Sequence, residues 1–430
     1  MNITLYLALA ILFITIYLLL KKYETRTVLI GAGLALAIIA MHPLAALDAF
    51  ATRMTSSCLI QAICASMGFA YVMKITRCNE HLVFFLSKVL SKFGIFIIPA
   101  AAASTMLINT AIPSAAGCAA AAGATLIPLM LNSKVKPAMA GAAILAGTIG
   151  SVLSPGWAHN AFVANMAHME IVDLIAFHTP YSLTIMGITL VLLTLTAVVF
   201  RDYGFEKHTN DDQSTASANN KTGDNEATKI KPNIIYSIIP FVPLVILLTG
   251  NSIFPEIKTG IAQAMIIGSL AALILTRTNP FNLTKTFFSG MGSAYGDVIG
   301  IIIAASVFAE GLKVSGLVDS FIHILESSRQ IAQWGASIGP SIMAILTGSG
   351  DAAAFAFNEA VTPHAQQMGF TIPSLGMLAA IAGSLGRTMS PVAGVTIVCA
   401  GMAGVSPMEI IKRTAPAMVV AIILLAVLLG

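Results

Sequence analysis

The chain has 430 residues, of which 57% are hydrophobic and 10% are charged. A soluble domain carries about 25% charged residues, so this composition excludes an ordinary soluble globular protein and makes lipid the solvent for most of the chain. The net charge of +4 comes from basic residues that membrane orientation explains, and nucleic acid is not expected as a partner. The five cysteines have no paired metal-ligand spacing, so neither disulfides nor a zinc site is expected.

Runs of about 20 mostly apolar residues predict membrane-spanning helices. In chain order these runs lie near 2–20, 28–48, 57–76, 181–200, 233–250, 259–276, 286–309 and 414–429. The first run has no basic residue before it and no small-residue cleavage site, so we expect a retained span rather than a signal peptide. The sequence therefore predicts an all-α polytopic membrane protein.

The distribution of basic residues predicts the orientation. Lys21, Lys22 and Arg26 follow the first run, which places this loop in the cytoplasm and the N-terminus outside. Followed along the chain, this orientation puts eighteen of the 23 Lys and Arg residues inside. Four fall outside, namely Arg53, Lys258, Lys313 and Arg329. The hydrophilic segment 201–232 is then a flexible cytoplasmic connector, and the C-terminus lies outside.

The two halves around this connector repeat one another. A Gly-x-x-Gly-x-x-x-Ser-Pro segment occurs at 147–155 and again 236 residues later at 383–391. Ser114 matches Ser349 at the neighbouring offset of 235. Because the first half starts outside and the second inside, the repeats are predicted to have inverted topology, as in carriers that expose one site alternately to each side.

Two apolar stretches do not fit simple spans. The stretch between Lys92 and Lys134 has both ends inside and is too short for two crossings and a turn, so it predicts a re-entrant helix hairpin with its tip at 109–114. The partner hairpin, about 333–363, has its tip at 347–351 and enters from outside. Irregular backbone at membrane depth is tolerated only where it is buried in protein or faces water, so both tips are expected to line a cavity.

Each hairpin is followed by one copy of the Gly-x-x-Gly-x-x-x-Ser-Pro segment, which predicts a broken membrane helix. Proline removes a backbone donor and glycine loosens the helix, so freed carbonyls would bind cations and helix N-termini would bind anions. An ordinary proline kink is the alternative for a single copy. Two copies in register, each after a hairpin, favour a binding role.

Arg387 is the strongest single candidate for a binding residue. An arginine at the centre of a membrane helix costs roughly 2.5–3.5 kcal/mol of insertion free energy, so it needs a partner. That partner is a substrate carboxylate, an internal acid or a ring of carbonyls, and a structural salt bridge is the alternative. Asp351 at the second tip would bind a cation or a proton, or neutralise Arg387. His159 would relay a proton or be a satisfied helix histidine, and Glu359 is expected to be a packing or gate residue.

The candidate groups for binding a small anion are the polar residues of the tips and breaks, namely Asn109, Thr110, Ser114, Ser154, Thr347, Gly348, Ser349, Arg387, Thr388 and Ser390. The candidate groups for a coupling Na⁺ or H⁺ are Gly150, Gly350, Asp351 and Gly386. No other metal or cofactor is expected. The residues and their spacing define the substrate only as a small anion.

Several of these motifs resemble the anaerobic C4-dicarboxylate carriers of the DcuC family. They are Leu-Gly-Arg-Thr-Met-Ser-Pro-Val-Ala-Gly-Val at 385–395, Ala-Gly-Met-Ala at 400–403, Ser-Pro-Met-Glu-Ile-Ile-Lys-Arg-Thr at 406–414, Thr-Gly-Ser-Gly at 347–350 and Leu-Ile-Pro at 126–128. The resemblance covers both halves and is strongest from about 340 to 416. It departs from the family at Asp351, where Asn is expected, and the Ser-Asn-Thr tip signature of the wider superfamily is only partly present.

The resemblance implies a carrier for succinate, fumarate, malate and related dianions in the inner membrane, within the ion-transporter superfamily of homodimeric elevator proteins. Residues 1–92 and 233–330 would then form the scaffold. Residues 93–200 and 331–430, with both hairpins and both broken helices, would form the transport domain, and 201–232 would connect the halves. A Na⁺/H⁺ antiporter, or a carrier of another small organic anion in the same superfamily, is the alternative.

Two other classes are disfavoured. The pore of a channel usually lies on a symmetry axis between identical subunits rather than within one chain that has an inverted internal repeat. An intramembrane metalloprotease or an ATP-driven pump would need a His-Glu-x-x-His motif or a Walker phosphate loop, and the sequence contains neither. The chain is therefore expected to be a secondary transporter rather than an enzyme.

The predicted orientation can be tested by cysteine labelling. A cysteine introduced at Ser214 in the connector is expected to resist membrane-impermeant thiol reagents in intact cells, whereas one at Ser252 is expected to react, because the two positions lie on opposite sides of the membrane. The measurement is the labelling of each variant in intact cells. The reverse pattern would overturn the orientation.

Overall fold

A computed structural model of the chain describes residues 3–90, 96–203, 233–252, 259–318, 320, 322 and 329–430. Within these residues every regular element is a helix, apart from one isolated β-bridge between Val135 and Tyr203. Five helical segments are long and apolar enough to cross a membrane, namely Ser57–Ile75, Ala115–Asn132, Pro137–Met166, Ile171–Val199 and Pro407–Leu429. The all-α class is therefore confirmed. Most of the predicted connector, residues 204–232 with Ser214, lies outside the described residues.

The first half consists of ten α-helices and one 3-10 segment in the described residues. In order they are α1 (Ile3–Leu20), α2 (Thr25–Ile39), α3 (Pro43–Met54), α4 (Ser57–Ile75), α5 (Cys78–Leu90), α6 (Ile97–Ala111), α7 (Ala115–Asn132), α8 (Pro137–Gly147), η2 (Thr148–Leu153), α9 (Ala158–Met166) and α10 (Ile171–Val199).

The second half follows a similar order. Its elements are α11 (Ile234–Ile238), η3 (Ile239–Phe241), α12 (Val242–Ser252), α13 (Ile261–Thr276), α14 (Pro280–Ala294), the π-helical η4 (Tyr295–Ile299), α15 (Gly300–Val314), α17 (Arg329–Thr347), α18 (Gly350–Ala360), η5 (Thr362–Met368), α19 (Ile372–Arg387), α20 (Gly394–Ala403) and α21 (Pro407–Leu429). Three pairs of equivalent helices begin 236 residues apart, at Thr25 and Ile261, at Ala158 and Gly394, and at Ile171 and Pro407.

The predicted span at 28–48 is wrong. Helix α2 ends at Ile39 and α3 begins at Pro43, because proline disfavours the helical conformation of the residue before it, and His42 has φ −126° and ψ 53°. The spans predicted at 181–200 and 414–429 were too short at their N-terminal ends. Helices α10 and α21 start earlier and continue through Pro180 and Pro416, respectively.

Helices α2 and α15 pack closely through glycine. A Cβ on Gly33 of α2 would lie 2.4 Å from the carbonyl oxygen of Val307, and one on Gly311 would lie 2.5 Å from the carbonyl oxygen of Gly33. Membrane helices associate through such small residues, because lipid provides no hydrophobic force between them. In the same way Gly290 of α14 allows the backbone of α4 to approach, since a Cβ there would lie 2.8 Å from the carbonyl oxygen of Met67.

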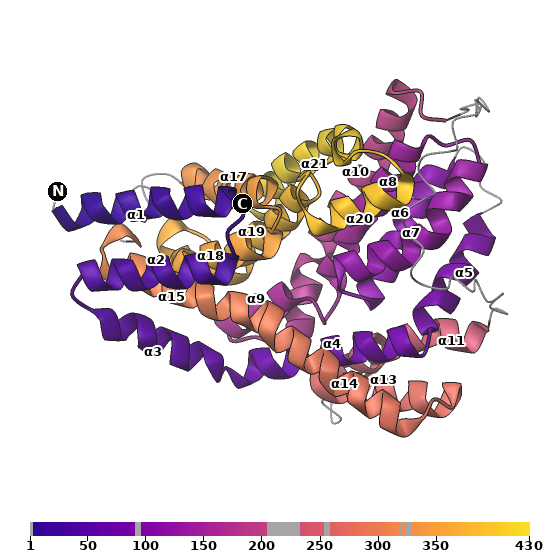
Figure 1. Cartoon of the computed structure of the whole chain (residues 1–430), viewed down its shortest axis with the longest axis horizontal. Coiled ribbons are helices and arrows are strands. Elements are labelled where there is room, and N and C mark those ends of the chain that lie inside the picture. Colours follow the sequence, from indigo (N-terminus) through magenta and orange to yellow (C-terminus); the bar gives the residue numbers. More distant parts are fainter. Residues whose placement is uncertain are drawn as a thin grey trace.

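The hairpins, broken helices and last helices of both halves pack on each other. Helix α19 packs on α17 and α18, α8 packs on α6, and α10 packs along α21. The short helix after each break lies against the opposite half, since α20 packs on α7 and α8 while α9 packs on α19. Figure 1 shows α1, α2 and α15 beside α17 and α18 at one end of the molecule, with α5, α6 and α7 at the other.

A buried ion pair joins the ends of α10 and α21. Arg413 donates from Nε and Nη2 to the two carboxylate oxygens of Asp202, at 2.6 and 3.0 Å, and Asp202 is fully buried. Lys136, which precedes α8, lies 3.4 Å from the same carboxylate. A bidentate pair of this kind is geometrically specific, so it fixes three segments of the two halves relative to one another.

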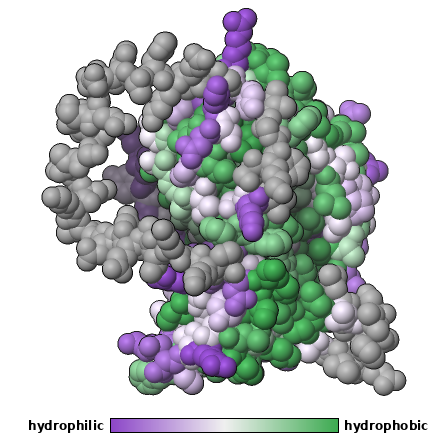
Figure 2. All heavy atoms as spheres, turned by 90° about the vertical axis from the view of Figure 1, so that its right-hand side faces the viewer, coloured by the Kyte–Doolittle hydropathy of each residue, from purple (hydrophilic) through white to green (hydrophobic). Residues whose placement is uncertain are grey.

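The outer surface is strongly apolar. Large hydrophobic side chains are exposed on several helices, including Phe13 at 68%, Val199 at 77% and Ile274 at 72%. Figure 2 shows broad hydrophobic areas on one side of the molecule, with hydrophilic residues in smaller groups. Such a surface is expected where lipid rather than water surrounds the protein.

Candidate functional site

The first hairpin tip closes onto the first helix break through hydrogen bonds. Helix α6 ends at Ala111, and Ser114 caps α7 by accepting from the backbone N–H of Gly117 at 3.2 Å. The fully buried side chain of Asn109 accepts from the N–H of Ser151 at 2.7 Å and donates to the carbonyl of Ile112 at 2.9 Å. Thr110 donates to the carbonyl of Gly150 at 3.1 Å.

Buried amides also satisfy the backbone of the first break. Asn160 of α9 donates to the carbonyls of Val152 and Ser154, at 2.8 and 2.9 Å. Its side-chain oxygen lies 3.2 Å from Nε2 of the buried His178 in α10. These carbonyls, which were expected to be free for a cation, are therefore engaged within the protein. The bonds of Asn160 and His178 were not predicted from the sequence, because no local pattern links positions 18 residues apart.

The second tip has the same form but different contacts. Helix α17 ends at Thr347, Gly348 has a left-handed φ of 78°, and Ser349 caps α18 by accepting from the N–H of Ala352 at 3.3 Å. A Cβ on Gly348 would lie 3.0 Å from the backbone of Val392. The positive φ and this close approach both favour glycine, so the tip packs directly on the second break.

Glycines of both motifs allow close backbone approach. A Cβ on Gly150 would lie 2.0 Å from the carbonyl oxygen of Met106, and one on Gly386 would lie 2.4 Å from that of Ser341. Gly350 approaches the carbonyl of Gly383, with 2.6 Å from its Cβ position. Each motif thus locks a broken helix to its own hairpin.

The two breaks also differ. Helix α8 ends at Gly147 and passes into the 3-10 segment η2, whereas α19 continues through Gly383 and Gly386 as far as Arg387. The second helix is therefore broken within its motif, as predicted, but at the Ser390-Pro391 end rather than at the glycines. The interruption lies at 388–393, where Thr388 donates to Leu385 O at 2.7 Å and its own carbonyl accepts from Thr414 at 3.0 Å.

Arg387 carries unpaired donors. Its Nε and Nη2 atoms are buried and have no hydrogen-bond partner in the described part of the chain. Leaving buried donors of a charged group unpaired is costly. A Cβ on Gly350 would lie 3.3 Å from the Arg387 Cβ, so the N-terminus of α18 lies directly beside this side chain. Two buried guanidinium nitrogens therefore lack partners on a side chain whose Cβ lies beside a helix N-terminus.

Asp351 pairs with His159 rather than with Arg387. Its carboxylate lies 3.0 Å from His159 Nε2, and it acts on Arg387 electrostatically without forming an ion pair in the described residues. His159 is 1% exposed and stacks on Phe355 with ring centroids 4.0 Å apart, whereas the Asp351 side chain is 51% exposed. This contact was not predicted from the sequence, because 192 residues separate the partners.

The side chains of the neutral candidates each have a hydrogen-bond partner, although the hydroxyls of Ser154 and Ser390 are engaged only as acceptors in the described residues. Thr347 donates to Met343 O at 2.7 Å and accepts from the N–H of Ser349 at 3.2 Å. The hydroxyl of Ser154 accepts from the N–H of Gly156 at 3.3 Å, and that of Ser390 accepts from the N–H of Val392 at 3.4 Å. Among the candidate residues, Arg387 thus stands apart by its buried, unsatisfied groups.

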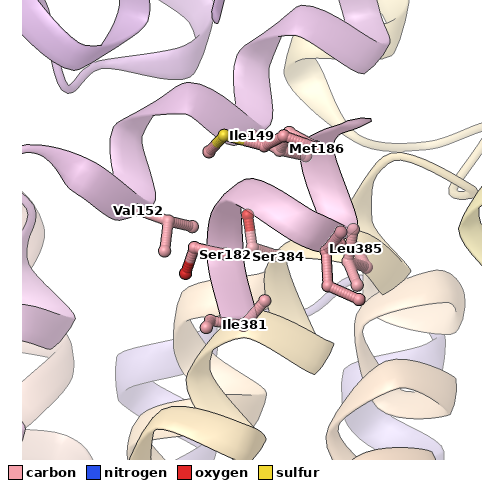
Figure 3. Close-up of a pocket in the computed structure, with 8 residues that line it drawn as sticks. Ile149, Val152, Ser182, Met186, Ile381, Ser384 and Leu385 are labelled. Carbon is pink, nitrogen blue, oxygen red and sulfur yellow. The ribbon is translucent and has the colours of Figure 1, made fainter. Parts of the chain in front are cut away.

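The junction between the first break, α10 and α19 is tightly closed. A cavity of about 10 Å³ there is lined by Ile149, Val152, Ser182, Met186, Ile381, Ser384 and Leu385. Figure 3 shows the hydroxyl groups of Ser182 and Ser384 among apolar side chains. This space holds at most one water molecule, so a dicarboxylate cannot enter this junction in the present conformation.

Solved transporters share this fold. The YdaH transporter of Alcanivorax borkumensis gives a TM-score of 0.57 at 16% identity, with 89% of this chain and 86% of that chain covered. MtrF of Neisseria gonorrhoeae, which represents a class of antimetabolite efflux pumps, gives 0.56 at 10% identity, with 89% and 82% covered. At these identities the likeness concerns the fold alone, which is that of a polytopic membrane transporter.

The chain belongs to the C4-dicarboxylate anaerobic carrier (DcuC) family, whose model matches residues 51–429. The DcuC transporter of Escherichia coli K12 is 29% identical over 381 residues, which are 86% of this chain and 79% of that protein. A Haemophilus influenzae chain described as an uncharacterised transporter is 47% identical over 281 residues, 64% of this chain and 99% of that one. The resemblance found in the sequence is confirmed, and the family is one of transporters rather than enzymes.

The packing role of the motif glycines predicts unequal effects of added methyl groups. Gly150→Ala is expected to destabilise the protein by about 1–3 kcal/mol, because its Cβ would overlap the carbonyl of Met106. Gly401→Ala in α20 is the matched control, since no atom lies within 4 Å of its Cβ position. The measurement is the thermal unfolding midpoint in detergent. Equal midpoints for the two variants would contradict the packing role.

Proposed function

We propose that this protein is a secondary carrier of C4-dicarboxylates of the succinate, fumarate and malate type, and that Arg387 binds one substrate carboxylate. Membership of the C4-dicarboxylate carrier family supports the substrate class. The observation that carries the site is the pair of buried, unpartnered guanidinium nitrogens of Arg387. The alternative of a Na⁺/H⁺ antiporter explains this unpaired cation less well.

The physical chemistry of a dianion fits this site. Burying an unpaired carboxylate costs several kcal/mol per charge unless donors replace the lost water. Arg387 offers a permanent charge and a planar fork that can hold a carboxylate by two hydrogen bonds. The N-terminus of α18 beside its Cβ can hold the second carboxylate, because backbone N–H groups and the helix dipole favour anions at a helix N-terminus.

In this proposal Asp351 binds the coupling ion. Its carboxylate is half exposed, lies 3.0 Å from His159, and belongs to the same tip as the anion site. A proton or Na⁺ bound there would reduce the repulsion between Asp351 and an incoming dianion. Exchange of dicarboxylates, or their movement with such a cation, are the two modes that this arrangement supports.

We further propose an elevator mechanism between inverted repeats. The equal helix order of the two halves at an offset of 236 supports the repeat. The mutual packing of both hairpins, both broken helices, α10 and α21 supports one moving unit, formed by residues 93–200 and 331–430. The Arg413–Asp202 pair ties the start of the connector to that unit. Residues 1–92 and 233–330 would form the scaffold of a homodimer.

One ionic contact crosses the proposed boundary between scaffold and moving unit. Arg53 of α3 donates to Glu359 of α18 at 2.8 Å and to Ser306 of α15 at 2.9 Å, and Ser306 also contacts Glu359. The Glu359 side chain is only 8% exposed. Sliding of the moving unit must break this contact, so it favours the conformation described here over the other state.

Substitution of Arg387 tests the substrate site. Arg387→Lys keeps the positive charge but loses the planar pair of N–H donors, and Arg387→Gln loses both the charge and this donor geometry. We expect a graded loss of succinate affinity, with Gln costing about 2–5 kcal/mol of binding free energy and Lys less. The measurement is the concentration dependence of labelled succinate uptake into liposomes preloaded with unlabelled succinate.

Arg329→Gln is the control for this experiment, because Arg329 is exposed and donates to the carbonyl of Gly430. It should leave succinate affinity unchanged. Normal succinate affinity in both Arg387 variants, with failure to insert or dimerise, would make Arg387 a structural residue. Succinate uptake that internal succinate does not stimulate would indicate a channel. Proton movement driven by Na⁺ without any succinate flux would indicate a Na⁺/H⁺ antiporter.

Distance measurements test the elevator. Spin labels at Leu131 on the first hairpin and Leu346 on the second should keep a nearly constant separation with and without succinate. Labels at Leu346 and at Leu270 of α13 should show two separations, because one lies on the moving unit and the other on the scaffold. All three side chains are exposed, and the exposed native Cys58 would be replaced. A change confined to the first pair would exclude the elevator.

A further inference from the structure

A large apolar cavity lies beside the second hairpin, and Thr347 of the candidate site reaches its wall. It has a volume of about 650 Å³ and lies between α1, α2 and α15 on one side and the second hairpin on the other. Leu5, Leu12, Leu29, Phe308, Gly339 and Met343 contribute to its wall. Figure 1 shows these helices side by side at the end of the molecule that carries the N-terminus.

The wall offers almost nothing to a polar ligand. The hydroxyls of Thr15, Ser320 and Thr347 reach the wall, but each donates to a carbonyl four residues earlier, at 2.7, 2.9 and 2.7 Å. The wall's further threonine, Thr25, lies next to the turn after α1. A buried polar ligand would lose its hydration without gaining partners, which is unfavourable. The apolar wall of this cavity therefore favours a hydrocarbon ligand over a polar one.

One end of the cavity is basic. Leu19 and Thr25 both line it, and the turn between them carries Lys21 and Lys22, which are exposed. Lys22 forms no ion pair in the described residues, whereas the nearby charge of Arg26 is neutralised by Glu24 at 2.5 Å. Basic groups at the edge of a membrane segment attract anionic lipid headgroups.

We propose that this cavity holds an acyl chain of an anionic phospholipid whose phosphate lies beside Lys21 and Lys22. Hydrocarbon from the bilayer is the solvent around the helices that enclose the cavity, and the charged turn supplies the matching end for the headgroup. The lipid then fills the space that α1, α2 and α15 leave beside the second hairpin, so that the hairpin borders a fluid chain along this face. This inference does not depend on the identity of the transported substrate.

Filling the cavity tests the proposal. A Cβ on Gly339 meets no atom within 4 Å, so Gly339→Phe places a ring in the cavity without a clash. Gly187→Phe in α10 is the matched control, because Gly187 also has open space around it but does not line the cavity. Both proteins are reconstituted with equal phosphatidylglycerol and phosphatidylcholine, extracted in detergent and examined by native mass spectrometry.

The wild-type protein and Gly187→Phe are expected to retain phosphatidylglycerol, and Gly339→Phe is expected to lose most of it. Lys21→Ala with Lys22→Ala should abolish the preference for phosphatidylglycerol over phosphatidylcholine, whereas Lys134→Ala in another exposed turn should preserve it. Equal lipid retention by both phenylalanine variants would overturn the proposal. A change of oligomeric state in Gly339→Phe without lipid loss would overturn it in favour of a second copy of the chain as the occupant.

A second measurement does not depend on the folding of any variant. Phosphatidylglycerol with a photoreactive group at the end of one acyl chain is crosslinked to the wild-type protein, and the labelled peptides are mapped. Crosslinks at Met343 and Leu12, in excess over the exposed Leu195 of α10, are expected. Crosslinks at Leu195 alone would show that lipid only surrounds the protein.

Discussion

The architecture depends on one constraint, the need to satisfy every backbone polar group inside a bilayer. Both hairpin tips and both helix breaks expose backbone that no helix pairs, and the protein supplies partners from neighbouring segments. Asn109 and Asn160 serve the first tip and break, while Ser349 and Thr414 serve the second tip and break. Bonds from Asn109 at the first tip and the close approach of Gly348 to Val392 at the second hold each tip against a break. Asp351 of the second tip lies beside His159, and Gly350 lies beside Arg387.

Local chemistry allowed the hairpins and breaks to be predicted from the sequence, because turn residues, prolines and their repetition are visible without a fold. The span at 28–48 was wrong because the effect of Pro43 on the residue before it was overlooked. The break was placed too early in the second motif, because glycines that allow a close approach between helices leave the same sequence pattern as glycines at a break. The pairs His159–Asp351 and Arg413–Asp202 could not be predicted, since only the packed fold brings these residues together.

The fold also explains why some Lys and Arg residues lie in segments that the predicted orientation places outside. Arg53 pairs with Glu359, Lys313 lies 3.5 Å from Glu310, and Arg329 donates to the carbonyl of Gly430. Lys258 lies outside the described residues. These three side chains are held by protein partners, so their positions reflect packing. Orientation statistics apply to residues without such partners.

The two halves share their helix order but not their charges, and this difference has an electrical consequence. The charged groups Arg387 and Asp351 both belong to the second tip and break, and their formal charges cancel. A dicarboxylate bound there would therefore cross the membrane with both of its negative charges uncompensated by these groups. The membrane potential acts on each charge with about 2.3 kcal/mol per 100 mV. Exchange of one dianion for another cancels this electrical work, whereas one-way uptake against an inside-negative potential requires accompanying cations.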